Sequence, residues 1–171
     1  MEVGTRGPNP SPLEVFIEQL GLDFERLGAS RSLGRLFGYL LVQDGPKSQD
    51  QVSAELGLSK GMTSIAMRQA VAGGLAQVVP RPGDRRHYYA VAPDCWVTST
   101  LVQLQVLVAW KHRAQEGVRA LDTGGRGESR PAAQLRDAVL FFEFLESLFA
   151  EVPEQFARYR AERASRSDGA P

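Results

Sequence analysis

Apolar residues recur every three or four positions along the first part of the chain, and this spacing predicts amphipathic helices. Ser11 and Pro12 favour a helix start, because a serine caps free backbone N–H groups and a proline at the first helical position needs no N–H partner. The stripe that follows lies on one helical face: Leu13, Ile17, Leu20, Phe24 and Leu27. Similar patterns predict further helices over residues 30–43, 48–56 and 59–73.

Two stretches rich in β-branched and aromatic residues follow these helices, over residues 75–79 and 87–92. The segment between them contains Pro82 and Gly83, a pair typical of tight turns, so the pattern predicts a β-hairpin. Helical patterns return over residues 95–121 and 131–158.

The order of these elements predicts a mainly α fold with a small β-hairpin: a winged helix-turn-helix with N- and C-terminal dimerisation helices. Three helices followed by a hairpin are typical of this arrangement, and the short glycine-containing turn at 57–59 is typical of a helix-turn-helix. The expected division is a flexible tail over 1–11, a dimerisation helix over 12–29, the winged domain over 30–94, a helical linker and dimerisation region over 95–158, and a second flexible tail over 159–171.

The last predicted helix carries more apolar surface than one neighbouring helix can cover. Its stripe and the residues that broaden it are Leu135, Val139, Phe141, Phe142, Phe144, Leu145, Leu148 and Phe149. A helix pair that extends from a small domain needs a partner for such a face, so we expect a homodimer built with the stripe of residues 13–27. A core within one chain is the alternative.

The charge of the chain is balanced overall but uneven along its length. Lys and Arg number 20, as do Asp and Glu, so the formal net charge is zero and the total charge indicates no partner. From residue 59 to residue 89, however, five cations stand against a single acid. Such a local excess of positive charge on a helix-turn-helix and its hairpin indicates nucleic-acid binding.

The side chains expected to contact double-stranded DNA lie mainly on the second helix of the pair and on the hairpin. A recognition helix enters the major groove, where Ser and Thr bond phosphates or base edges and Lys and Arg neutralise phosphates or reach guanine. A basic hairpin can reach the neighbouring minor groove. The candidates are Ser48, Ser59, Lys60, Thr63, Ser64, Met67, Arg68, Arg81, Arg85, Arg86 and His87, whereas Met62, Ile65, Ala66, Gln69, Ala70 and Val71 are expected to face the core.

Other classes of protein find little support in the sequence. His87 and His112 have no acidic or nucleophilic partner at a telling spacing, and no metal-ligand cluster or phosphate-cradling loop is present, so we expect no enzyme and no metal or cofactor. The single cysteine, Cys95, indicates a reducing compartment; it is either a redox-active thiol at a helix start or an inert buried one. A winged helix can also act as a protein–protein interaction module without DNA binding, and this alternative stays open.

The expected location is the cytoplasm, without a membrane segment. No apolar run approaches the roughly 18 residues that a membrane helix needs. Residues 1–12 are rich in Gly and Pro and lack the apolar centre of a signal peptide.

Two motifs resemble the GbsR branch of the MarR-type winged helix-turn-helix transcriptional regulators: SKGMTS at 59–64 followed by Arg68, and PGDRRHYY at 82–89. The resemblance covers residues 13–92 and, more loosely, the helices after them. It implies a homodimer whose two lobes read a pseudo-palindromic operator, with control of transcription, often repression, and in some members release by a small effector. Gln77 departs from the branch, which often has a basic residue there, and Gly73 and Ala76 replace bulkier residues.

The resemblance also implies that Asp84 supports a neighbouring arginine of the wing. Tyr88 and Tyr89 alternate faces of a strand, so one is expected in the core and the other at the base of the wing. Tyr39, Trp96 and Trp110 are candidates for an effector pocket, because aromatic cages bind quaternary ammonium groups and the GbsR branch is associated with control by choline-type osmolytes. Packing is the alternative role for all three rings.

Overall fold

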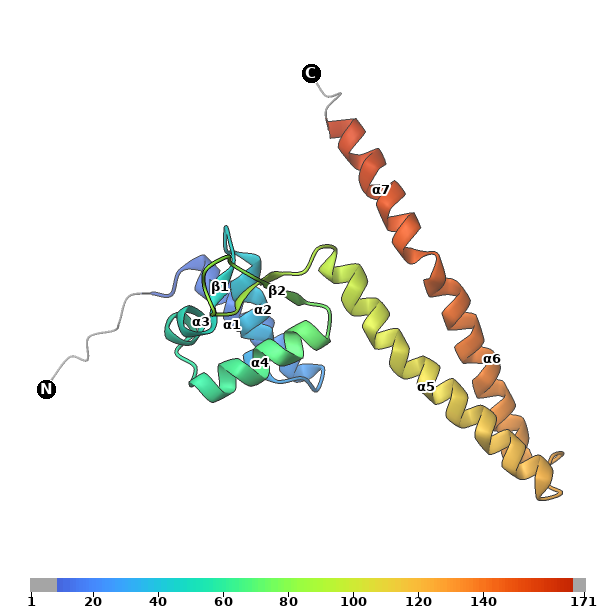
Figure 1. The fold of residues 1–171 in the computed structure, drawn as a ribbon. Coiled ribbons are helices and arrows are strands. Elements are labelled where there is room, and N and C mark those ends of the chain that lie inside the picture. The colour runs from blue at the N-terminus through green and yellow to red at the C-terminus, as the bar shows by residue number, and fades with distance from the viewer. Residues whose placement is uncertain (1–8, 168–171) are drawn as a thin grey trace, which may run out of the picture. The chain divides into compact units, whose positions relative to one another are not determined.

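The computed structural model describes residues 9–167, which fold as two compact units divided after Trp96 (Figure 1). The N-terminal unit contains α1 (Pro12–Arg26), α2 (Arg31–Leu41), β1 (Lys47–Ser48), α3 (Gln49–Leu56), α4 (Lys60–Ala72), β2 (Ala76–Val79) and β3 (Tyr88–Val91). The helices that follow are α5 (Cys95–Thr123), α6 (Arg130–Ala150) and α7 (Val152–Ser167). The predicted fold class, mainly α with a winged helix-turn-helix, is confirmed.

Four helices of the N-terminal unit begin at a serine that caps them. The side chains of Ser11, Ser30, Ser48 and Ser59 each accept a hydrogen bond from the backbone N–H three residues later. Each such cap contributes about 1 kcal/mol to helix stability. These local interactions explain why the helix starts could be read from the sequence.

The wing is part of a three-stranded antiparallel sheet in the order β1-β3-β2. β2 and β3 form the predicted hairpin, with Val79 opposite Tyr88 and Ala76 opposite Val91. β1 adds a third strand, in which Ser48 pairs with Tyr88. β1 was not predicted, because two residues are too few to show the alternation that identifies a strand.

The core of the N-terminal unit joins α2, α3, α4 and the sheet. Its largest fully buried side chains are Phe37, Leu36, Met67, Val52 and Thr63. The middle of the α1 stripe also packs here, because Ile17 is buried and Leu20 and Phe24 lie against the core. Leu13 and Leu27, at the two ends of that stripe, remain exposed. The apolar stripe of α1 therefore packs largely against the core of its own chain.

α1 and α2 approach each other closely at glycines. A Cβ atom added at Gly34 would lie 2.5 Å from the carbonyl oxygen of Leu20 and 2.8 Å from the Cα atom of Gly21. Both neighbours are backbone atoms of α1 and cannot move as a side-chain end can. The close packing of these two helices therefore depends on the absence of a side chain at position 34.

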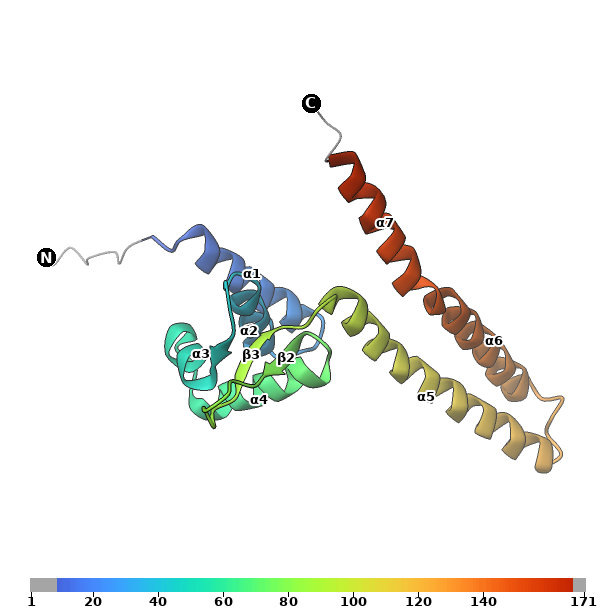
Figure 2. The same ribbon diagram turned by 45° about the horizontal axis from the view of Figure 1, so that its top comes forward.

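In the C-terminal unit α5 and α6 run antiparallel (Figures 1 and 2). Their connecting loop is tied down by Arg136, which donates to the Gly127 carbonyl at 2.8 Å and to the Asp122 carboxylate at 2.9 Å. Lys111 of α5 and Glu146 of α6 form an ion pair between the helices. In the described part of the chain no helix is both long and apolar enough to span a membrane.

The single helix expected over residues 131–158 is instead two helices. α6 ends at Ala150 and α7 begins at Val152. Pro153 explains the interruption, because its ring has no N–H and clashes with the carbonyl four residues earlier, that of Phe149. The prediction of one continuous helix across Pro153 is therefore wrong.

The prediction of a flexible tail over residues 159–171 is also wrong for most of that range, because α7 continues to Ser167. Side chains one helical turn apart support it: the Arg160 guanidinium lies 5.6 Å from the Phe156 ring and that of Arg163 lies 5.3 Å from the Tyr159 ring. At the N-terminus residues 9–11 precede α1 without helical structure. Residues 1–8 and 168–171 of the two expected tails lie outside the described residues.

Candidate nucleic-acid interface

The helix-turn-helix consists of α3, a turn over residues 57–59, and α4. Gly57 ends α3 in the left-handed region with a φ of +61°, which glycine adopts without strain. Leu58 is buried in the core, and its carbonyl accepts a hydrogen bond from the Ser53 hydroxyl at 2.6 Å. The turn is therefore held from inside and fixes the direction in which α4 leaves it.

The face of α4 that packs on the core is one residue away from the predicted face. The buried residues are Thr63, Ala66, Met67 and Ala70. The expectation that Thr63 and Met67 point outward is wrong. Thr63 can be buried because its hydroxyl donates to the Ser59 carbonyl at 3.0 Å, which leaves no unpartnered polar group.

The outward face of α4 carries residues that were assigned to the core. Met62, Ile65 and Val71 are exposed, as is Gln69, so these four assignments are wrong. A shift of one residue turns a helix by about 100°, and both faces of this helix contain apolar residues, so periodicity alone did not separate them. The one useful signal was Gln69, a polar residue that the chosen face would have buried.

Ser48 is also not available as a surface contact. It is 4% exposed, and its hydroxyl caps α3 by accepting from the backbone N–H of Gln51 at 3.4 Å and donating to the Gln51 side chain at 3.0 Å. The capping-box pattern that predicted the start of α3 thus accounts fully for this serine.

The two cations of α4 that were predicted to point outward lie on one side of the helix together with a serine. Lys60, Ser64 and Arg68 are four residues apart, so they follow one another along one side of the helix. Arg68 donates to the Ser64 hydroxyl at 2.7 Å. The Lys60 ammonium lies 2.9 Å from the Asp50 carboxylate, but both side chains are well exposed and the pair contributes little stability.

The wing tip is held by a carboxylate. A tight turn closes it, with the Asp84 N–H donating to the Arg81 carbonyl at 3.1 Å and Gly83 at a φ of +81°. The Asp84 carboxylate accepts hydrogen bonds from the Arg86 guanidinium at 2.7 Å and from the Tyr88 hydroxyl at 2.9 Å. These bonds, those from Arg86 foremost, hold the pKa of Asp84 well below its usual range. The support of a wing arginine by Asp84 is as the resemblance implied.

The two wing tyrosines and Arg81 brace the base of the hairpin. Tyr88 is buried, and the Arg81 guanidinium stacks 3.9 Å from its ring centre. Arg81 also donates to the Pro46 carbonyl at 3.4 Å. Tyr89 is half-buried against the core. Arg81 therefore packs back onto the wing, whereas Arg85 makes no ion pair with any residue that the structure describes.

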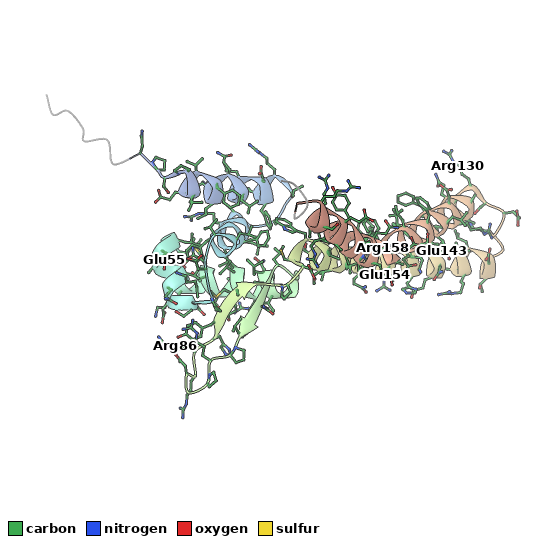
Figure 3. All side chains as sticks on the ribbon, turned by 90° about the horizontal axis from the view of Figure 1, so that it is seen from above. Glu55, Arg86, Arg130, Glu143, Glu154 and Arg158 are labelled. Carbon is green, nitrogen blue, oxygen red and sulfur yellow. The ribbon has the colours of Figure 1, made fainter. Side chains whose placement is uncertain are left out.

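The cations of α4 and of the wing meet at one surface. Lys60, Arg85, Arg86 and His87 line a common hollow of about 310 Å³ together with Ser48, Gln49 and Asp50 at the start of α3. Figure 2 shows the hairpin loop beside the start of α4, and Figure 3 shows Arg86 projecting from the wing. Lys60 of α4 and Arg85 and Arg86 of the hairpin thus lie together as expected, whereas Arg68 and Arg81 do not line this hollow. We call this surface the basic face.

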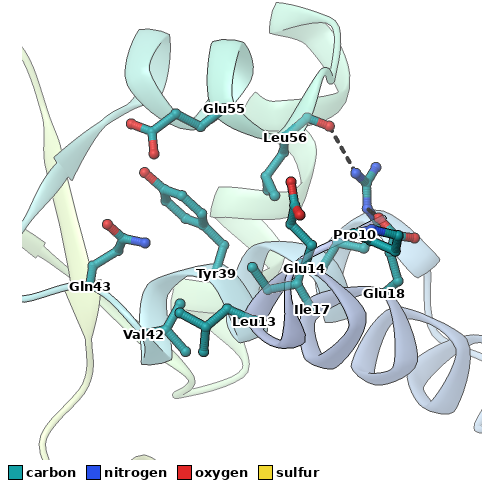
Figure 4. A pocket seen from close by; sticks show the side chains of 11 residues that line it. Pro10, Leu13, Glu14, Ile17, Glu18, Tyr39, Val42, Gln43, Glu55 and Leu56 are labelled. Carbon is teal, nitrogen blue, oxygen red and sulfur yellow. Dashed lines mark hydrogen bonds and ion pairs between the residues drawn. The ribbon is translucent and has the colours of Figure 1, made fainter. Parts of the chain in front are cut away.

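The three aromatic residues considered for an effector pocket do not line one cavity. Tyr39 is buried between α1, α2 and α3, where it lines a cavity of about 540 Å³ (Figure 4). Trp96 packs edge-on against Phe37 at 5.2 Å. Trp110 belongs to the C-terminal unit and contacts Phe142 at 6.2 Å. Of the three rings only Tyr39 lines this cavity, and Trp110 lines a separate hollow of about 290 Å³ in the C-terminal unit.

Cys95 occupies the interior of the N-terminal unit. It is 4% exposed and belongs to the core cluster. Burial raises the pKa of its thiol, which disfavours the reactive thiolate. Of the two roles considered for Cys95, the inert one agrees with this environment.

The fold and the basic face are those of a winged helix-turn-helix protein, and comparison with known proteins places the chain in a family. The chain is 30% identical over 142 residues to the HTH-type transcriptional regulator MmpR5 of Mycobacterium tuberculosis, a match that covers 82% of this chain and 86% of that protein. A crystal structure of a transcriptional regulator superposes with a TM-score of 0.78 at 25% identity, covering 86% of this chain and 99% of the other. No family model matches the sequence. The chain belongs to the HTH-type transcriptional regulators.

Proposed function

We propose that this protein is a sequence-specific regulator of transcription that binds double-stranded DNA and acts as a repressor, inserting α4 into the major groove. One observation carries the proposal: Lys60 at the start of α4 and Arg85, Arg86 and His87 of the wing line one hollow. A surface with three permanent cations and one acid, beside the N-terminus of a helix, attracts the phosphate backbone. Its family membership supports the same function.

The proposed contacts divide between the basic face and the exposed side of α4. Lys60, Arg85, Arg86 and His87 neutralise or bond phosphates, because they surround the hollow between α3, α4 and the wing. Ser59, Ser64 and Arg68 lie on the exposed side of α4 and supply contacts to base edges. Arg81 is exposed, and because its guanidinium stacks on Tyr88 we assign it to support of the wing.

The test begins with DNA selected by the purified protein from a random-oligonucleotide pool and with DNA that flanks its coding region. Fluorescence anisotropy across a salt series should give an affinity that falls steeply with salt. Replacing Arg85 and Arg86 by Ala should weaken binding to all sequences and reduce the salt slope by about 1 for each lost phosphate contact. Arg26→Ala with Arg113→Ala removes two exposed arginines elsewhere and serves as the control.

Two results would contradict the proposal. Unchanged affinity in the wing double variant would remove the basic face from the DNA complex. No DNA complex even at low salt, together with a protein partner that co-purifies, would favour the interaction-module alternative. Repression itself is tested by a reporter placed behind the selected operator, where loss of the protein should raise transcription.

We infer that the regulator acts as a homodimer of the MarR type, within its GbsR branch, on a pseudo-palindromic operator in the cytoplasm. Large apolar side chains of the C-terminal unit support this, since Leu140 is 65% and Phe144 is 59% exposed, with Trp110, Phe141 and Leu148 also exposed. Such a face is stabilised by burial against a second copy. A two-fold dimer would present two recognition helices about 34 Å apart.

Sedimentation measurements test the dimer. Leu140→Glu with Phe144→Glu should convert it to a monomer and abolish binding to a full operator. A wild-type protein that sediments as a monomer at micromolar concentration would contradict the inference.

A small effector is a second element of the proposed function, and the cavity at Tyr39 supports it. The buried Tyr39 ring lines the cavity beside Glu55, with Leu13 as an apolar wall (Figure 4). Glu18 in the same lining is paired with Arg35 at 2.6 Å. Glu14 and Glu55 leave the lining with an excess of negative charge, which together with an aromatic face favours a small organic cation. Calorimetry with choline-type cations should detect binding that Tyr39→Ala weakens, and the absence of heat with every such cation would remove this element.

A further inference from the structure

Two large apolar side chains stand on the outward face of α4, where the core does not need them. Met62 is 47% and Ile65 is 51% exposed. They are three residues apart and therefore lie side by side on the helix surface. The opposite face of α4 is already fully packed through Ala66, Met67 and Ala70. Neither exposed side chain is explained by the fold of this unit.

The surroundings of this pair indicate what covers it. Arg68 lies next to Ile65 on the surface of α4, and Lys60 at the start of the helix shares a hollow with the wing cations Arg85 and Arg86. A protein partner for an apolar pair would meet these cations unfavourably unless it were acidic. Duplex DNA is a polyanion whose major groove exposes one kind of apolar group, the C5-methyl of thymine. The combination of charge and apolar surface thus fits DNA with thymines at defined positions.

We propose that Met62 and Ile65 read thymine methyl groups, so that each operator half-site has thymine beneath the first two turns of α4. This inference rests on the proposed function. Residues three apart are separated by about 4.5 Å along a helix axis. Base pairs in duplex DNA are stacked about 3.4 Å apart. The two side chains therefore reach neighbouring base pairs, and these methyl contacts add sequence discrimination that the phosphate contacts cannot supply.

Deoxyuridine substitution in the selected operator tests this directly. Deoxyuridine keeps the pairing edge and the O4 acceptor of thymine and lacks only the C5-methyl. Replacing each thymine in turn should weaken wild-type binding about fourfold for each contacted methyl and have no effect elsewhere, as expected from the burial of one methyl-sized group. The affected positions should number one or two in each half-site.

Protein variants combined with the deoxyuridine operators test the same contacts from the protein side. Met62→Ala and Ile65→Ala should each bind the thymine operator more weakly and should lose the thymine-over-deoxyuridine preference at one position. Val71→Ala is the matched control, because Val71 is an exposed apolar residue (37%) near the other end of the same helix. It should keep the full preference. Circular dichroism melts establish that the variants are folded.

The outcomes separate this inference from the function on which it rests. If the wild-type protein binds no DNA, the proposed function fails. If it binds its operator but deoxyuridine substitution at every thymine leaves the affinity unchanged, the methyl contacts are refuted while the function stands. The methyl contacts are also refuted if Met62→Ala and Ile65→Ala alter the oligomeric state but retain the thymine preference, since the pair would then belong to a protein contact.

Discussion

Replacing Gly34 by Ala should destabilise the N-terminal unit, although alanine is the better helix former. The added Cβ atom would lie 2.5 Å from the Leu20 carbonyl oxygen, 2.8 Å from the Gly21 Cα and 2.8 Å from the Phe24 Cβ. Real Cβ contacts do not occur at such distances, so α1 must move away from α2. That movement loosens the packing of Ile17, which is buried at this junction.

The size of the effect follows from two opposing contributions. Gly→Ala within a helix gains about 1 kcal/mol of helix propensity. Overpacking a well-packed junction costs about 1–3 kcal/mol, and more where backbone atoms must separate. We expect the second contribution to exceed the first and the free energy of unfolding to fall by up to about 2 kcal/mol.

Two further glycines provide a graded control. At Gly38 an added Cβ would lie 3.2 Å from the end of the Leu20 side chain and 3.3 Å from the Ile17 Cα, and at Gly61 no atom lies within 4 Å. Gly38→Ala should therefore be less destabilising than Gly34→Ala, and Gly61→Ala should stabilise by up to about 1 kcal/mol. Urea unfolding followed by circular dichroism, at one fixed protein concentration, measures all three. A Gly34→Ala variant as stable as Gly61→Ala would refute the inferred packing of α1 on α2.

Three other predictions concern the wing, the core and the turn. Because the pKa of Asp84 is lowered, its hydrogen bonds to Arg86 are fully present above the ordinary aspartate pKa and are lost as the pH falls through the lowered pKa. NMR titration of the Asp84 carboxyl should therefore give a midpoint below 3.8. A midpoint at or above 3.8 would contradict the geometry. The Cys95 thiol should react with a thiol reagent only when the protein unfolds, and rapid modification of the native protein would show that it is not buried. Gly57→Ala should lower the free energy of unfolding by about 1 kcal/mol, because a φ of +61° strains a residue with a Cβ; an unchanged urea midpoint would count against the left-handed turn.

Features that depend on neighbouring residues were predictable from the sequence. The serine caps of α1 to α4, the glycine that ends α3 and the Pro82–Gly83 turn all act within a few positions of the chain. These local signals were sufficient to predict the order of the helices and strands, and from that order the winged-helix fold. The basic face also followed, because the order of a winged helix places the start of the recognition helix next to the hairpin.

Features that depend on distant residues were not predictable in the same way. Which side of α4 packs inward is decided by contacts with α2 and α3, and both sides of α4 offered apolar residues. The strand β1 exists only because Ser48 meets Tyr88 from forty residues further along the chain. For the same reason the candidates Thr63, Met67 and Ser48 were placed outside, and Met62 and Ile65 inside.

Asp50 has a consequence for how a regulator of this kind searches a chromosome. Its carboxylate lies on the basic face, 2.9 Å from the Lys60 ammonium, so Lys60 is already paired with an acid in the protein without DNA. A phosphate that pairs with Lys60 must displace the Asp50 carboxylate and is then repelled by this nearby negative charge. In the proposed complex this cost is the same for every sequence, whereas base contacts form only at the operator. Because the Lys60–Asp50 pair is well exposed, the effect is small, and its direction is to weaken binding to unrelated DNA.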